Sequence, residues 1–483
     1  MAEPFPQPAS MTPRHLTITT GFTITEQETT VTTDLRRRID EGPMSRYQWT
    51  AIAICIALNV LDGYDVLAMA FTSTSVSDDW DLSTSTLGLL LSAGLFGMAL
   101  GSLGLAPLAD IIGRRKLILA CLVLSSTGML LSSLSQNATQ LGLLRVLTGV
   151  GIGGILACSN VIGGELASTR WRGLAVSLNS TGYAIGATLG GIAALLLVES
   201  FGWRSVFVAG GIGTAALIPL VLVRLPESID FLLVRQPAGA LDTVNAFARR
   251  IGQEPIHELP VETTSGSGGS GIISTTRRLF DTQNRRTTLL VWTAFFFTMF
   301  GFYFVTSWTP KLLVEAGMSA KEGITGGMVL NLGGILGTFL LGALAARYRL
   351  ARVLIAYLLV TAGLMTIFVP SAAVFALALT VGFGLGIVVN GCIAGLYALT
   401  TTAYAAPIRA TGMGWAIGIG RIGAIVSPLI AGALLDADWS PASLYVLMAV
   451  LFIAAAGAIM ALSSSGRRRV STEVTSSTAP AAV

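Results

Sequence analysis

Charged residues are scarce in this chain. Asp, Glu, Lys and Arg together make up 12% of its 483 residues, whereas soluble domains average about 25%. Hydrophobic residues make up 53%, so long segments carry no charge at all. This composition excludes an ordinary water-soluble fold and indicates a membrane protein.

Histidine and cysteine are also rare. His15 and His257 lie in polar segments, and the four cysteines lie in separate apolar runs: Cys55, Cys121, Cys158 and Cys392. Metal sites and Ser-His-Asp catalytic triads need such residues close together, so we expect no metal site and no enzyme activity. We interpret the cysteines as small buried hydrophobic residues. Basic and aromatic residues form no mixed stripe, so we expect no nucleic-acid partner.

The chain does have many long apolar segments. A bilayer core about 30 Å thick needs roughly 20 apolar residues per helix. We therefore predict an all-α membrane protein with twelve transmembrane helices. The expected helices span 47–71, 86–109, 116–134, 140–163, 174–198, 204–224, 287–313, 323–346, 352–369, 373–398, 406–434 and 442–463.

Polar segments separate these helices into two groups. We predict a disordered cytoplasmic tail over 1–45, six-helix bundles over 46–224 and 287–463, a cytoplasmic linker loop over 225–286, and a cytoplasmic tail over 464–483. The linker contains a Gly/Ser run of the kind that makes chains flexible.

The two groups also resemble each other. Related segments recur at a nearly constant offset, from Leu108 to Leu344 and from Arg172 to Arg409. We therefore predict two pseudo-symmetric six-helix halves, an arrangement that transporters use to enclose a midplane cavity.

The distribution of charge predicts the orientation. Basic residues such as Arg114 and Arg172 concentrate in the even-numbered loops and in both tails, and acidic residues such as Asp78 and Asp436 concentrate in the odd-numbered loops. Because loops rich in Lys and Arg remain inside, we expect both termini to be cytoplasmic. The expected location is the cell (inner or plasma) membrane, crossed many times, with the lipid bilayer as a partner.

Several motifs resemble the major facilitator superfamily. Residues 108–116 (Leu-Ala-Asp-Ile-Ile-Gly-Arg-Arg-Lys) resemble its signature loop between helices 2 and 3, residues 145–154 its helix 4 motif, and residues 226–228 the segment after helix 6. The second-half copy of the loop motif is degraded, with Ala346 where the first half has Asp110. The resemblance covers most of the chain and implies the major facilitator fold.

A narrower resemblance points to one family. Asp62-Gly63-Tyr64-Asp65 is similar to the D-G-x-D motif of the aromatic acid:proton symporter family, as is the stretch 409–421. This implies a monomeric secondary active transporter (symporter) that imports small aromatic carboxylates such as benzoate, 4-hydroxybenzoate, protocatechuate or vanillate, for aromatic hydrocarbon catabolism. The proton would be the coupling ion, with no other cofactor.

Other functions remain open. A proton-driven exporter (antiporter) of aromatic acids or drugs would share the fold and the loop motif. A non-transporting ligand sensor is a second alternative, although the tails and the linker contain too few apolar residues for a signalling domain. A membrane enzyme would need clustered catalytic residues, which the sequence lacks.

Two acids lie within the first apolar segment. A charge at membrane depth costs roughly 2.5–3.5 kcal/mol on insertion scales, so Asp62 and Asp65 call for a functional explanation. They share one helix face. Two neighbouring carboxylates that are poorly solvated repel each other, so one of them tends to keep its proton. We predict proton coupling or substrate gating, with helix breaking or ion pairing as the alternative. Gly63 is expected to permit local unwinding.

Arginines are the expected carboxylate-binding groups. Arg421 lies near the middle of the eleventh segment, and its guanidinium stays charged and can hold a carboxylate through two hydrogen bonds. The alternative is a structural ion pair with Asp62 or Asp65. Arg145, in the fourth segment, is a similar candidate.

Other candidates form a gate and a cavity lining. The gate, a switchable set of charge contacts, comprises Asp110, Gly113, Arg114 and Arg115. The candidates for the substrate lining, each with interhelical hydrogen bonding as the alternative, are Tyr64, Asn179, Tyr183, Asn331, Asn390 and Tyr397. The seventh segment is rich in aromatic residues that could stack on an aromatic substrate.

Overall fold

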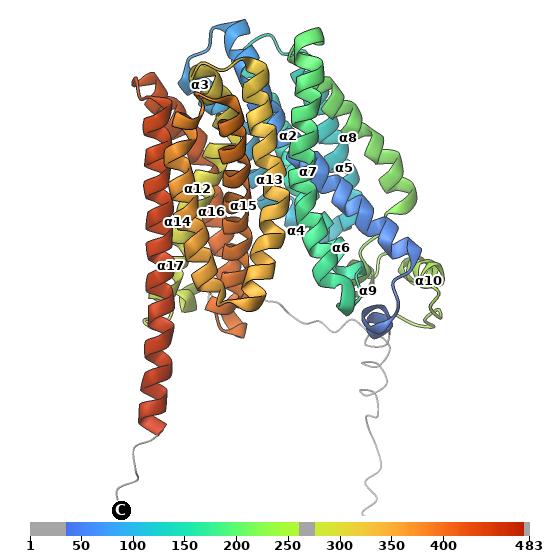
Figure 1. Ribbon diagram of the computed structural model, residues 1–483. Coiled ribbons are helices and arrows are strands. Elements are labelled where there is room, and N and C mark those ends of the chain that lie inside the picture. Colours follow the sequence, from blue (N-terminus) through green and yellow to red (C-terminus); the bar gives the residue numbers. More distant parts are fainter. Residues whose placement is uncertain (1–34, 260–275, 478–483) are drawn as a thin grey trace, which may run out of the picture.

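The chain folds into a bundle of long helices. The computed structural model describes residues 35–259 and 276–477, and these residues contain no strand. Twelve of the helices are long and apolar enough to cross a membrane, as predicted. They are α2 (Arg46–Trp80), α3 (Thr84–Gly104), α5 (Arg114–Ser132), α6 (Ala138–Leu166), α7 (Thr169–Phe201), α8 (Arg204–Arg224), α12 (Arg285–Glu315), α13 (Ala320–Arg347), α14 (Leu350–Ser371), α15 (Phe375–Ala403), α16 (Ala406–Asp436) and α17 (Pro441–Ser477) (Figure 1).

Local signals set several helix starts. Ser45 and Gln48 form a capping box at the start of α2, and Ser319 and Glu322 form another at α13. Asn137 accepts a hydrogen bond from the backbone of Gln140 at the start of α6. These side chains satisfy backbone N–H groups that have no partner within the helix.

The two halves repeat one packing pattern. In the first half α2 packs on α7, α3 on α6, and α5 on both α6 and α8. In the second half α12 packs on α16, α13 on α15, and α14 on both α15 and α17. Each pair in the second half corresponds to a pair in the first, so the sequence offset reflects a structural repeat.

Some predicted boundaries need correction. The predicted second helix, 86–109, is two helices, because α3 ends at Gly104 and a short α4 (Ala106–Ile112) follows. The predicted linker contains α9 (Ile229–Arg235) and α10 (Ala240–Arg250). The helices α9 and α10 bury four apolar side chains: Phe231, Leu232, Val244 and Phe247. Burial of these side chains stabilises this part of the linker as helices.

The predicted disordered N-terminal tail is partly helical. Residues 35–41 of the predicted disordered tail form a helix, with Leu35 and Ile39 buried. Residues 1–34 and the Gly/Ser run lie outside the described residues. At the other end α17 continues to Ser477, while its candidate membrane span ends at Ser463, the predicted boundary.

Glycines allow close helix contact. A Cβ atom at Gly63 would lie 1.9 Å from the carbonyl oxygen of Tyr183, and one at Gly186 would lie 1.8 Å from that of Val60. The α2 helix continues without a break through Gly63. Gly63 therefore brings α2 and α7 together, and the expected local unwinding is wrong. The glycines of α6 act in the same way: a Cβ atom at Gly149 would lie 2.2 Å from the Gly94 carbonyl oxygen.

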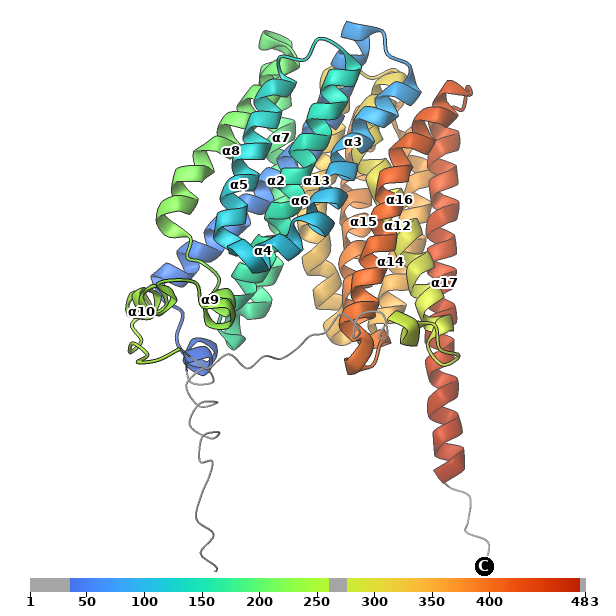
Figure 2. The same cartoon turned by 180° about the vertical axis from the view of Figure 1, so that it is seen from behind.

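The halves meet mainly toward one end of the bundle. We call this the acidic end, since Asp79 and Asp436 lie there, and the opposite end, with Arg114, α9 and α10, the basic end. At the acidic end the backbone N–H groups of Thr84 and Ser85 donate to the two carboxylate oxygens of Asp436, each at 3.0 Å. Toward the basic end the halves diverge (Figures 1 and 2).

Candidate functional site

The two aspartates of α2 have different partners. Asp65 forms a buried ion pair with Arg145 of α6, in which the two side chains are each 2% exposed. Arg145 Nη1 donates to Asp65 Oδ1 at 2.6 Å, and Nη2 donates to Oδ2 at 3.1 Å and to the Asp65 carbonyl at 2.9 Å. Gly94 leaves room for this guanidinium, because a Cβ atom there would lie 3.0 Å from Nη2. The pair joins α2 to α6 within the first half.

Asp62 is buried without such a pair. It is 4% exposed, and its Oδ1 has no hydrogen-bond partner. The charges that act on it electrostatically belong to Arg421 and Asp65. A buried carboxylate oxygen without a hydrogen bond is costly, which makes Asp62, rather than Asp65, the candidate for a functional role.

Arg421 faces the region between the halves. It lies one turn before Ile425, whose carbonyl accepts a hydrogen bond from Ser92 Oγ at 2.8 Å. In the described part of the chain Arg421 forms no ion pair with a carboxylate. It lines a small cavity of about 60 Å³ together with Leu95, Met299, Tyr303, Tyr397, Ile417, Ala424 and Ile425.

This cavity combines one cation with apolar and aromatic walls. Leu95 comes from α3, and the other lining residues come from α12, α15 and α16. The Tyr397 ring packs edge-on against Phe295, with the ring centroids 5.6 Å apart. A planar anion with an apolar body matches such a lining, because guanidinium binds carboxylate and the rings can stack.

Tyr183 adds a second polar atom without a partner. Its hydroxyl is buried and makes no hydrogen bond. It interacts electrostatically with Tyr303 and Asp62, and Tyr303 in turn interacts with Arg421. Asp62, Tyr183, Tyr303, Tyr397 and Arg421 therefore form one cluster, which we call the central site.

The remaining lining candidates lie elsewhere. The Tyr64 hydroxyl donates to the carbonyl of Val206 at 2.8 Å, within the first half. Asn331 and Asn390 each donate to the carbonyl four residues earlier in their own helix. Asn179 hydrogen-bonds to Asn59 and Asn160 and lines a separate cavity with Cys55. The Tyr64 and Asn179 bonds join different helices, as in the interhelical alternative, whereas the Asn331 and Asn390 bonds stay within their own helices.

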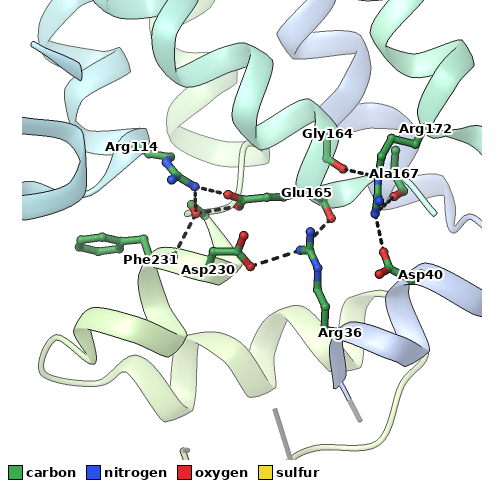
Figure 3. Close-up of polar contacts among 10 residues, drawn as sticks. Arg36, Asp40, Arg114, Gly164, Glu165, Ala167, Arg172, Asp230 and Phe231 are labelled. Carbon is green, nitrogen blue, oxygen red and sulfur yellow. Dashed lines mark hydrogen bonds and ion pairs between the residues drawn. The ribbon is translucent and has the colours of Figure 1, made fainter. Parts of the chain in front are cut away.

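The predicted gate residues lie at the basic end, where one of them, Arg114, belongs to the polar network that Figure 3 shows. Arg114 forms an ion pair with Glu165 of α6 and donates to Ser228 Oγ at 2.7 Å. The same arginine contacts Asp110 at 3.3 Å, but the Asp110 side chain is 63% exposed whereas that of Glu165 is 5% exposed. Glu165 is therefore the principal partner of Arg114.

Gly113 allows the loop to turn tightly beneath this network. Its φ of 102° is unfavourable for any residue with a side chain, and a Cβ atom would lie 2.6 Å from Glu227 Oε2. Glu227 Oε1 accepts hydrogen bonds from the backbone N–H groups of Arg115 at 2.9 Å and Ser228 at 3.0 Å. The Arg115 guanidinium donates to the carbonyl of Leu222.

The helix at residues 35–41 docks on the same network. Arg36 contacts Asp230 at 3.4 Å and donates to the Glu165 carbonyl at 3.3 Å. Asp40 accepts from Arg172 at 2.5 Å. Figure 3 shows Arg36 and Asp40 approaching from below, opposite Glu165 and Arg172. These contacts tie the segment before α2 to α6, α7 and α9.

Sequence reasoning missed several of these residues. Glu165 is a lone acid near the end of an apolar segment, a position that should have suggested a partner for the nearby loop arginines. Leu35 and Ile39 are four residues apart, which is helical spacing, but the surrounding polar sequence obscured this. Tyr303 was one of many aromatic residues in its segment, and nothing in the sequence distinguished it from the others.

We expect the two acids beside Arg114 to contribute unequally to stability. Glu165→Gln removes a buried charge partner and should lower the free energy of unfolding by about 1–3 kcal/mol, since Ser228 and Asp110 still contact Arg114. Asp110→Asn, the matched control, should cost less than about 1 kcal/mol because its carboxylate is exposed. Thermal unfolding of the detergent-purified proteins measures both, and an equal fall in Tm would contradict the assignment.

Comparison with known proteins identifies the family. Residues 52–396 match the Major Facilitator Superfamily model. The chain is 33% identical to a gallate transporter from Pseudomonas putida, covering 89% of this chain and 94% of the relative, and 31% identical to a 4-hydroxybenzoate transporter from Acinetobacter baylyi, covering 89% and 93%. The resemblance to aromatic acid transporters is thus confirmed.

A solved structure agrees on the fold. The xylose transporter XylE from E. coli, in a partially occluded inward-open conformation, superposes with a TM-score of 0.67 at 18% identity, covering 85% of this chain and 97% of that one. The twelve long helices, the repeated packing and the motif matches agree with one another. The chain is a multi-pass membrane transporter, not an enzyme, and it belongs to the major facilitator superfamily.

Proposed function

We propose that this protein is a proton-coupled symporter that imports small aromatic carboxylates across the cell membrane. The central site is the observation that carries the proposal. In the described part of the chain it combines an arginine that forms no ion pair, in an apolar and aromatic cavity, with a buried aspartate whose Oδ1 makes no hydrogen bond. The relatives named as gallate and 4-hydroxybenzoate transporters support the same substrate class.

Each charged group has a role in the proposed cycle. Arg421 binds the substrate carboxylate, and Asp62 binds the proton. With the carboxylate on Arg421 and the proton on Asp62, the closed cavity contains no uncompensated charge, which lowers the cost of moving it through a low-dielectric region. The Asp65–Arg145 pair keeps its charges compensated throughout and holds α2 against α6.

We also propose an orientation and a gate. The positive charge at the basic end favours a cytoplasmic location for it and for both termini. The halves then meet on the outer side and diverge toward the cytoplasm, which matches release of substrate inside. The network of Asp110, Gly113, Arg114 and Arg115 would rearrange as the halves rock, since charge contacts can form in one state and break in the other.

Uptake into proteoliposomes tests the proposal. Radiolabelled gallate, 4-hydroxybenzoate, benzoate and vanillate would be offered with an inward proton gradient, with and without a protonophore. We expect accumulation of at least one acid, abolished by the protonophore. Empty liposomes are the control, because the neutral acids can cross lipid unaided. Equilibration of the acid without accumulation would exclude proton coupling. Proton-driven transport of the acid only in the outward direction would favour an exporter.

The proposal predicts a large effect at Arg421. Arg421→Ala should raise the KM for transported acid at least about tenfold, because a hydrogen-bonded charge is lost from the site. Arg421→Lys should have an intermediate KM, since it keeps the charge but not the planar fork. Initial uptake rates over a range of concentrations give these values. An unchanged KM in Arg421→Ala would exclude the residue from the binding site.

A further inference from the structure

The first turn of α3 is capped by a side chain from the other half of the protein. The first backbone N–H groups of a helix have no partner within that helix, and Ser83 Oγ accepts a hydrogen bond from only one of them, the N–H of Thr86. The N–H groups of Thr84 and Ser85 donate instead to Asp436 at the end of α16, each to a different carboxylate oxygen at 3.0 Å. The positive end of the helix dipole also favours a carboxylate at this position.

Further contacts join the same two helices, which lie side by side (Figure 2). The Thr84 hydroxyl donates to the carbonyl of Gly432 at 2.9 Å and to the Asp436 carboxylate. Glycines allow the two backbones to approach closely. A Cβ atom at Gly432 would lie 2.4 Å from the Thr84 carbonyl oxygen, and one at Gly88 would lie 2.5 Å from that of Pro428. This close approach keeps the Asp436 side chain within reach of the first turn of α3.

The corresponding helix of the second half, α13, is capped locally. Ser319 and Glu322 form a capping box at its start, so its first turn receives a carboxylate from its own segment. Where α13 passes α7 of the first half, the contact is apolar, because a Cβ atom at Gly191 would lie 2.9 Å from the Met328 Cβ atom. The cap on α3 is therefore not a general consequence of the repeat.

We propose that Asp436 is a positioning residue of the transport cycle, which holds the acidic end closed by capping α3 across the boundary between the halves. Transporters of this fold rock one half against the other around the binding site, so α3 and α16 must separate in the state that is open at this end. Separation breaks the bonds from Thr84 and Ser85 to the Asp436 carboxylate. The cap stabilises the closed state alone, and its removal shifts the population toward the open state.

The distance between two spin labels across the acidic end tests this role in the full-length protein. Asp78→Cys in α2 and Lys321→Cys in α13 provide the labelling sites, because both residues are exposed at this end and belong to different halves. The native cysteines Cys55, Cys121, Cys158 and Cys392 are buried. The longer of the measured distances reports the open state. No substrate is added, so the result is independent of the proposed function.

Asp436→Ala is expected to raise the ratio of open to closed protein at least about threefold, which is the usual effect of losing a helix cap. Asp436→Asn keeps one acceptor oxygen without the charge, so its ratio should lie between those of the wild type and Asp436→Ala. Glu199→Ala is the matched control, because Glu199 is exposed at the same end of α7 and takes no part in these contacts. A wild-type ratio in Asp436→Ala would overturn the proposal.

The variant Thr84→Pro tests the same cap from the α3 side. Thr84 is the first residue of α3, a position where proline fits a helix although it has no N–H. Ser83 before it already has the extended backbone, with ψ of 154°, that a following proline requires. The variant removes both Thr84 donors and should also raise the open-to-closed ratio. Asp436→Ala should then add less than it does in the wild type, because the two changes remove shared bonds. Fully additive effects would contradict the cap.

Discussion

Asp62→Asn is expected to abolish proton-driven accumulation while preserving exchange of substrate between the two sides. Asparagine resembles a permanently protonated aspartate, so the substrate site keeps its shape but no longer releases a proton. For one proton per anion, a gradient of one pH unit supports about tenfold accumulation. The variant should instead equilibrate its substrate to a ratio of about one, while counterflow against a preloaded substrate continues.

The control for this prediction lies on the same helix. Asp78 is exposed at the acidic end of α2, outside the central site, and Asp78→Asn should accumulate substrate as the wild type does. Accumulation by Asp62→Asn at the wild-type ratio would show that another group carries the proton. If Asp62→Asn also lost counterflow, the carboxylate itself would be needed for substrate binding, and not only its ability to gain and lose a proton.

Asp65→Asn is expected to destabilise the protein much more than Asp62→Asn does. Removing one member of a buried ion pair typically costs about 3–5 kcal/mol, because the other charge is left uncompensated. Arg145 is 2% exposed and bonds to Asp65 through two of its nitrogens. Among the described residues the Asp62 carboxylate forms no ion pair, so its neutralisation should leave stability unchanged or raise it. Thermal unfolding in detergent compares the two variants.

A double variant separates pairing from any direct role in transport. Combining Asp65→Asn with Arg145→Gln removes both buried charges together, so stability should recover most of what Asp65→Asn alone loses. If the double variant instead lost as much stability as the two single variants together, the two side chains would act independently. Equal Tm values for Asp62→Asn and Asp65→Asn would contradict the difference that the structure assigns to the two aspartates.

The helices were predictable because the signal for them is local. A helix that crosses a bilayer must be apolar over its whole length, and the α8 boundaries, Arg204–Arg224, coincide with the predicted segment. The break at Leu105 between α3 and α4 was missed, since both helices belong to one apolar run. The helix at residues 35–41 was missed because its two buried residues stand among polar ones.

Pairing within the site was much harder to predict, because the partners are far apart in sequence. Asp62 and Asp65 are the same residue type in the same apolar segment, so the sequence does not distinguish them. Only the fold shows that Arg145, 80 positions from Asp65, pairs with Asp65 and not with Asp62. Arg421 was predicted either to pair with an aspartate or to bind substrate, and only the fold shows that it forms no ion pair among the described residues. Tyr183 was one of six lining candidates until its hydroxyl proved to be without a hydrogen bond.

The most direct test of the account is to measure proton movement when substrate is added. Proteoliposomes containing a lumenal pH dye would receive 4-hydroxybenzoate with no imposed gradient, and empty liposomes would correct for passive entry of the neutral acid. The account predicts that the wild-type protein acidifies the lumen as substrate enters and that Asp62→Asn does not. Substrate entry through the wild-type protein without proton movement, or equal acidification by Asp62→Asn, would contradict it.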